Sequence, residues 1–271
     1  MNKSDKELAF LQDLYVATDW GERFAELVDE HVEVPKKGNM LYVAAGTGGH
    51  ALAMQERAGN HLTLVCVDEN EECLELGRVK AMAVRADPEF RRAQLEALSF
   101  EDDQFDLVVG DASLVAAERL PEMISEMVRV AAPGGTVALS LATSSSFGEF
   151  FSVYWEALRN CGVKEHEHDV ESLITELPTV TAVEEMATRE GLDNVTSWTR
   201  VEEFDYQSGE EFLNAPLITD FLLTRWLESL PEAEAQERVS KEIARIIDAE
   251  RQDMDFALSV KATLVVGRKA R

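Results

Sequence analysis

The chain has little cysteine and no long hydrophobic run. Its three cysteines, Cys66, Cys73 and Cys161, form no CxxC pair, and no histidine lies at metal-ligand spacing. We therefore expect a reducing compartment, with no disulfide, no structural zinc and no other bound metal. No window approaches the roughly 20 apolar residues of a membrane span, and the charged N-terminus lacks the apolar core of a signal peptide. These absences predict a soluble, cytoplasmic protein that does not associate with membranes.

Basic residues are also scarce. The chain has 26 Lys and Arg against 52 Asp and Glu, which gives a formal net charge of −26. The longest basic runs are pairs, such as Lys36-Lys37 and Arg91-Arg92. An acidic field of this size repels phosphate backbones, so a nucleic-acid partner is disfavoured. The acidity fits either a solubility surface or an adaptation to high salt, and the charge alone leaves both open.

Buried strands and amphipathic helices alternate through the first half of the chain. Its 271 residues are enough for one large domain. Apolar runs predict strands at 40–45, 62–67, 105–111 and 136–142, with a short one at 91–95. Helical spacing predicts helices at 50–58, 71–84 and 121–131. The alternation indicates an α/β protein with right-handed crossovers and a parallel sheet.

The two ends of the chain add helices and two more strands. Residues 1–35 are expected to form one or two N-terminal helices, and later segments predict helices at 150–160 and 183–190 and strands at 195–206 and 256–269. No repeat or linker is visible, so we interpret residues 1–271 as a single domain with a helical insert at 207–255. The insert is richer in apolar residues than a solvated helix needs, which predicts a lid or a homodimer face. We favour the lid, because a desolvated site protects the alignment of reacting groups.

The stretch MLYVAAGTGGHALAM, residues 40–54, places three glycines between a predicted strand and a predicted helix. Glycines allow close approach of a ligand, and the start of a helix attracts anions. The absence of a Lys-Ser/Thr pair excludes a P-loop. Gly46, Gly48 and Ala51 fit the dinucleotide-binding pattern, and Asp68 lies where an acid would hold ribose hydroxyls. The same features suit a nucleoside that is not a dinucleotide, so the turn alone does not identify the ligand.

Motifs further along the chain resemble those of the class I S-adenosylmethionine-dependent methyltransferases, in particular the small-molecule enzymes similar to the ubiquinone/menaquinone methyltransferases. The family's glycine motif, acid-x-G-x-G-x-G, is represented by Tyr42, Ala44, Gly46 and Gly48, and its D-x-S-x-x-M motif by Asp68, Asn70 and Cys73. Its third segment, G-D-A-x-x-L-P-F, and the following F-D-x-V and L-x-P-G-G motifs are matched in order by Ala93, Gln94, Leu95, Leu98, Ser99, Phe100, Phe105, Asp106, Val108, Ala131, Pro133, Gly134 and Gly135. The resemblance covers residues 38–142 and the final strand.

This resemblance implies a Rossmann-like, doubly wound α/β fold with a helical insert. Its seven-stranded sheet would have the order 3-2-1-4-5-7-6, with strand 7 antiparallel. The implied cofactor is S-adenosyl-L-methionine, bound by the core at 38–145, and the implied partner is a small-molecule methyl acceptor. The residues expected at the cofactor are Ala44, Ala45, Gly46, Thr47, Gly48, Asp68, Glu69, Gln94, Leu95 and Asp111.

The chain departs from the family pattern at three places. Tyr42 replaces an acid, Ala44 replaces the first glycine, and Gln94 replaces an aspartate that meets the adenine. The methyl group of Ala44 is tolerated if φ stays negative at this position. The amide oxygen of Gln94 can accept the same hydrogen bond as the aspartate.

No catalytic residue can be named from the sequence. Methyl transfer from a sulfonium depends mainly on alignment, although a hydroxyl acceptor more often needs a base. His50, His166, His168 and Ser144–Ser146 are candidates for a role in the site, but each is more simply explained by packing, capping or exposure. Two alternatives to a methyltransferase stay open: a non-catalytic or regulatory nucleoside-binding protein of the same fold, and an NAD-dependent oxidoreductase.

Overall fold

The computed structural model describes residues 3–59, 61–163, 166–230, 232–250 and 255–271. The chain forms two compact units. The first comprises Met1–Leu141, Thr179–Thr199 and Ala262–Arg271, and the second comprises Ala142–Pro178 and Arg200–Lys261. The interpretation of the whole chain as one domain stays a prediction. In the part of the chain that the structure describes, no helix has both the length and the apolar character needed to cross a membrane.

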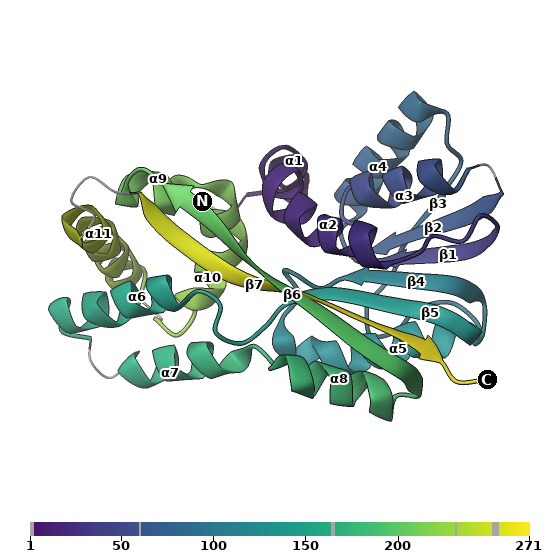
Figure 1. Ribbon diagram of the computed structural model, residues 1–271. Helices are drawn as coiled ribbons and strands as arrows, with labels where there is room; N and C mark the ends of the chain where they lie inside the picture. Colours follow the sequence, from purple (N-terminus) through teal and green to yellow (C-terminus); the bar gives the residue numbers. More distant parts are fainter. Residues whose placement is uncertain (1–2, 60, 164–165, 231, 251–254) are drawn as a thin grey trace. The chain divides into compact units, whose positions relative to one another are not determined.

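Seven strands form one sheet in the order β3-β2-β1-β4-β5-β7-β6, with β7 antiparallel, which confirms the predicted topology (Figure 1). The strands are β1 Gly38–Val43, β2 Leu62–Asp68, β3 Glu89–Arg92, β4 Phe105–Asp111, β5 Ala131–Ala142, β6 Leu192–Tyr206 and β7 Phe256–Lys269. β1 lies parallel to both β2 and β4, with Tyr42 opposite Cys66 and Val109. The carboxyl ends of these three strands therefore meet at one edge, where open α/β sheets bind ligands.

Four strands, β1, β3, β5 and β6, begin earlier in the chain than the sequence pattern indicates. β3 occupies Glu89–Arg92 rather than 91–95. β5 starts at Ala131 and includes the segment Pro133–Gly135, which was expected only to end the preceding helix. The pairing of β4 with β5 is irregular there, where the register shifts between Phe105 and Leu107.

Helices of the first unit form two groups (Figure 1). One group is the N-terminal segment of α1 Asp5–Leu11, a π-helix at Gln12–Gly21 and α2 Glu22–His31, together with α3 Gly49–Ala58 and α4 Glu71–Val84; the other is α5 Leu120–Val130, preceded by the 3-10 turn Ala117–Arg119, and α8 Val180–Arg189. Leu41 and Val43 belong to the core cluster formed with α5 and α8. Side chains alternate along a strand, so Tyr42 points to the opposite face, where α2 and α3 lie.

The second unit has an aromatic core of its own. Its helices are α6 Gly148–Asn160, α7 Glu167–Glu176, α9 Gly209–Asn214, the π-helix Leu217–Leu222, α10 Leu223–Trp226 and α11 Ala233–Glu250. The ring of Phe150 stacks on that of Trp226 with centroids 4.1 Å apart, and it lies 5.9 Å from that of Phe212. The apolar residues of the insert thus have a partner in α6. The lid and the dimer face stay predictions.

His166 and His168 lie at the start of a helix that follows α6. His166 precedes α7, and its Nδ1 lies 2.8 Å from the carboxylate of Asp169. His168 lies on α7 with a side chain that is 83% exposed. Among the described residues, no group of three or more His, Cys, Asp or Glu side chains is arranged to hold a metal ion.

Candidate cofactor and acceptor site

The turn after β1 keeps the backbone shape of a glycine turn despite its alanine. Ala44, Gly46 and Gly48 have φ values of +55°, +53° and +73°. The condition for tolerating the methyl group of Ala44 without strain, a negative φ, is therefore not met. The backbone N–H of Ala45 donates to the carbonyl of Val67 in β2 at 2.9 Å, which ties the turn to the neighbouring strand and fixes its path.

Asp68, at the end of β2, holds this turn from the other side. Its Oδ2 accepts the N–H of Gly46 at 2.8 Å, and its Oδ1 accepts the N–H of Asn70 at 2.9 Å. Burial raises the pKa of Asp68, and the hydrogen bonds from Asn70 and Gly46 oppose that shift. Each carboxylate oxygen has a second lone pair, so Asp68 can support the turn and still accept a ligand hydroxyl.

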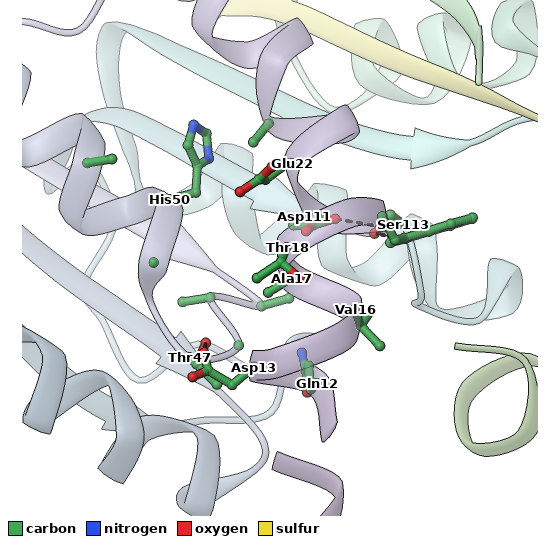
Figure 2. Close-up of a pocket in the computed structure, with 18 of the residues that line it drawn as sticks. Gln12, Asp13, Val16, Ala17, Thr18, Glu22, Thr47, His50, Asp111 and Ser113 are labelled. Atoms are coloured by element: carbon green, nitrogen blue, oxygen red, sulfur yellow. Dashed lines mark hydrogen bonds between the residues drawn. The ribbon is translucent and has the colours of Figure 1, made fainter. Parts of the chain in front are cut away.

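A cavity of about 430 Å³ lies within the first unit, beside the glycine turn (Figure 2). Its walls come from the turn, the start of α3, the loop after β4 and the N-terminal helices. This volume is typical of small-molecule sites. Of the predicted cofactor residues that the structure describes, five line the cavity: Ala44, Ala45, Gly46, Thr47 and Asp111.

The other five predicted residues lie outside this cavity: Gly48, Asp68, Glu69, Gln94 and Leu95. Glu69 is bound by Arg119, whose Nη2 lies 2.7 Å from its Oε1. Gln94 is exposed and forms an isolated bridge with Ala97, whereas Leu95 is buried in the core. The turn and Asp111 therefore share one cavity, and the adenine and ribose contacts stay predictions.

The N-terminal segment forms the wall opposite the turn (Figure 2). Thr47 Oγ1 donates to Asp13 Oδ1 at 2.5 Å, and Lys80 Nζ donates to Thr47 Oγ1 at 2.9 Å. Lys80 also forms an ion pair with Asp13. The amide of Gln12 lies so close to Gly46 that a Cβ on the glycine would come within 2.8 Å of Gln12 Nε2. Sequence reasoning missed these contacts, because no motif links residues so far apart in the chain.

Asp111 lies at the end of β4, deep in the cavity wall. Its Oδ1 accepts the N–H of Ser113 at 3.0 Å, and Ser113 Oγ accepts the indole N–H of Trp20 at 2.9 Å. Burial raises the pKa of Asp111, and the Ser113 hydrogen bonds partly offset this shift. Trp20 is buried in the first unit, so this aromatic residue of the N-terminal segment belongs to both the site and the core. Tyr15, in the same segment, is 57% exposed.

A second polar network joins β1, α2 and α3. Tyr42 Oη lies 2.8 Å from His50 Nδ1, and His50 Nε2 lies 2.8 Å from Asp29 Oδ1. Arg57 Nη1 donates to Asp29 Oδ2 at 2.6 Å. Tyr42, His50 and Asp29 all line the cavity. His50 therefore belongs to a hydrogen-bond network at the cavity, whereas its sequence position indicated only packing or capping.

The sheet order, the antiparallel last strand and the glycine turn define a Rossmann-like protein of the methyltransferase type. Residues 40–135 match the family described as methyltransferase domain. The ubiquinone/menaquinone biosynthesis C-methyltransferase UbiE of Pseudomonas entomophila is 30% identical over 173 residues, covering 59% of this chain and 68% of that protein. The chain belongs to the family of class I S-adenosylmethionine-dependent methyltransferases.

Other similar proteins agree with this assignment. The demethylmenaquinone methyltransferase of Renibacterium salmoninarum is 31% identical over 136 residues, which cover 50% of this chain and 54% of that protein. The chain thus spans about half the length of such relatives. The crystal structure of the YcgJ protein from Bacillus subtilis aligns with a TM-score of 0.60 at 16% identity, covering 92% of this chain and 99% of that one. At this identity the likeness is one of fold.

Proposed function

We propose that this protein transfers a methyl group from S-adenosylmethionine to a small-molecule acceptor. The observation that carries the proposal is the cavity in which the glycine turn and Asp111 face the N-terminal helices. S-adenosylmethionine supplies an activated methyl group on a sulfonium, so the protein's main task is to align the acceptor with it.

The residues present fit this cofactor. Gly46 and Gly48 adopt left-handed conformations, which bring the backbone of the turn close to a ligand. Gly48 is the N-cap of α3 and has no side chain, so it offers no side-chain acceptor to the N–H groups of the first helical turn. These donors suit the carboxylate of the methionine part, and the buried Asp111 carboxylate suits a cationic group. Asp68 would hold the ribose hydroxyls, and Gln94 with Leu95 would meet the adenine.

The test is calorimetric titration with S-adenosylhomocysteine, with NAD as the comparison. We expect S-adenosylhomocysteine to bind and NAD not to bind. Asp68→Ala should weaken binding by about 1.5–3 kcal/mol, since hydrogen bonds to a charged group are lost. Asp102→Ala is the matched control, because it removes an exposed carboxylate that pairs with Arg129 outside the cavity. Equal affinity in wild type and a folded Asp68→Ala variant would contradict the assignment of Asp68.

Binding alone does not separate an enzyme from a non-catalytic relative. Transfer of label from methyl-tritiated S-adenosylmethionine to a panel of phenols, quinols, amines and thiols makes that distinction. The naphthohydroquinones belong in the panel, because curated relatives are demethylmenaquinone methyltransferases. Tight binding of S-adenosylhomocysteine with no labelled product across the panel would favour the regulatory alternative.

A further inference from the structure

The cavity contains a chain of hydrogen-bonding groups at the place where the family's motif has an acid. Tyr42 stands at that motif position, and its phenol reaches His50 on α3, which in turn reaches Asp29 on α2. The rings of Tyr42 and His50 meet edge to face, with centroids 5.6 Å apart. The phenol is nearly completely buried, and the side chain of His50 is 16% exposed. The arrangement is thus fixed on three elements, and Tyr42, His50 and Asp29 all line the cavity.

The partners of His50 determine where its proton lies. Burial would raise the pKa of Asp29, but hydrogen bonds from His50 and Arg57 outweigh this effect and hold its pKa far below the usual range. An ionised carboxylate only accepts hydrogen bonds, so His50 Nε2 carries the hydrogen toward Asp29. The Nδ1 of a neutral imidazole is then an acceptor, and it receives the phenolic hydrogen of Tyr42.

We infer that Tyr42 and His50 form a proton relay for a hydroxyl group of the methyl acceptor. The inference rests on the proposed methyl transfer. Tyr42 is the catalytic residue that touches the acceptor hydroxyl, and His50 and Asp29 are positioning residues that act through it. A hydroxyl acceptor needs a group within hydrogen-bond reach that takes its proton, and Tyr42 Oη keeps a lone pair for that proton while it donates to His50. Burial raises the pKa of Tyr42, so the phenol keeps its own proton until that proton passes to His50. The apolar part of the cavity wall is formed by Val16, Ala17, Trp20, Ala25, Ala53 and Leu114.

The proton and electron movements balance. Tyr42 Oη takes the hydroxyl proton of the acceptor while its own phenolic proton passes to His50 Nδ1. The new bond joins the acceptor's oxygen, or the carbon conjugated with it, to the methyl carbon. The bond that breaks is the methyl–sulfur bond, and its electron pair stays on sulfur, which becomes a neutral thioether. Asp29 stabilises the imidazolium that His50 has become, and Arg57 remains bound to Asp29 on the other side.

The first test is the tautomer of His50 in the free protein, measured by nitrogen-15 NMR of the imidazole and assigned by the signal lost in His50→Gln. We expect the neutral form with hydrogen on Nε2. His31, which stacks on Trp198 at 4.2 Å outside the cavity, is the matched control, and His31→Gln should leave the His50 signals unchanged. Hydrogen on Nδ1 would overturn the relay, because the imidazole would then donate to Tyr42.

The second test uses 4-nitrophenol, whose absorption reports its ionisation, in the presence of saturating S-adenosylhomocysteine. We expect the bound probe to ionise at a lower pH than the free probe by about one unit, which corresponds to a tenfold change in the equilibrium. Tyr42→Phe, His50→Gln and Asp29→Asn should each abolish this shift. The same pH titration must be repeated with variants of the other ionisable residues of the cavity wall, because their charges also act on the bound probe. These residues are Asp13, Glu22, Glu26, Lys80 and Asp111.

The outcomes separate the relay from the proposed function. In Tyr42→Phe, which keeps the ring, S-adenosylhomocysteine affinity should stay within about twofold of wild type while the ionisation shift disappears. No binding of 4-nitrophenol at millimolar concentration, or an unchanged shift in Tyr42→Phe and His50→Gln, overturns the relay alone. Failure of wild type to bind S-adenosylhomocysteine overturns the proposed function, whereas the tautomer of His50 is read independently of any cofactor.

Discussion

The thiol of Cys73 on α4 donates a hydrogen bond to Oε1 of Gln12 in the N-terminal π-helix, with sulfur and oxygen 3.3 Å apart. Cys73 is fully buried, and burial raises the pKa of its thiol to about 12. Its side chain therefore becomes reactive only when the N-terminal segment leaves α4. Because the same segment walls the cavity, the reactivity of Cys73 reports how often this wall opens.

The wall should open more often when its ion pair is removed. Lys80 holds both Asp13 and Thr47, so Lys80→Met should speed the labelling of Cys73 by dithionitrobenzoate about fivefold, the equivalent of about 1 kcal/mol in the opening equilibrium. Half-exposed Cys161 should react first in both proteins, and Cys66, buried in β2, should stay unlabelled until unfolding.

Lys241→Met is the matched control for this experiment. Lys241 pairs with Glu237 on the surface of α11 in the second unit, where an exposed pair contributes little. Its removal should leave Cys73 labelling unchanged. Equal Cys73 rates in Lys80→Met and wild type would show that the Asp13–Lys80–Thr47 contacts do not hold the segment in place.

Ala44→Gly should stabilise the protein. Ala44 adopts a left-handed conformation, which costs a residue with a Cβ about 1–2 kcal/mol, and glycine adopts it without that cost. Glycine gains entropy in the unfolded chain, which offsets about 0.4–1 kcal/mol, so we expect a net gain of about 0.5–1 kcal/mol. Urea unfolding measures it. Ala45→Gly makes the same chemical change where φ is not positive, and it should destabilise; if both variants destabilise alike, Ala44 carries no strain.

Gly77→Ala should destabilise the first unit. A Cβ at Gly77 would overlap the ring of Phe90, and one at Gly48 would come within 2.9 Å of the same ring. Phe90 on β3 thus fills the space between α4 and the glycine turn. Overpacking of this kind typically costs about 1–3 kcal/mol in the free energy of unfolding. Phe90→Leu should restore part of this loss in the double variant, and a fully additive double-mutant cycle would rule out the steric explanation.

Trp226→Ala should lower the free energy of unfolding of the second unit. The indole is buried against Phe147, Phe150 and Phe151, and truncating a buried aromatic typically costs about 3–5 kcal/mol. Tyr15→Ala is the control, because Tyr15 is exposed and such changes usually stay within about 0.5 kcal/mol. If Trp226→Ala keeps wild-type stability and loses only acceptor binding, the lid interpretation of the insert gains over the core role.

The sequence predicted those features that depend on local patterns. Continuous apolar runs located β1, β2 and β4, and the family resemblance supplied the strand order. The glycine turn and Asp111 were found because both follow strands at the binding edge of the sheet. Asp29, Gln12 and Lys80 were missed, since their roles depend on contacts between elements. The strain at Ala44 was missed as well, because the hydrogen bonds to β2 and Asp68, rather than the residue type, fix its φ.

The position of β7 has a consequence for how the chain is made. It is the last strand to be synthesised, yet it lies inside the sheet, between β5 and β6. During translation, β6 emerges with no neighbour to pair with, because β7 separates it from β5. The sheet can close only after β7 has left the ribosome, so we expect β6 and the open edge of β5 to depend on chaperones until then.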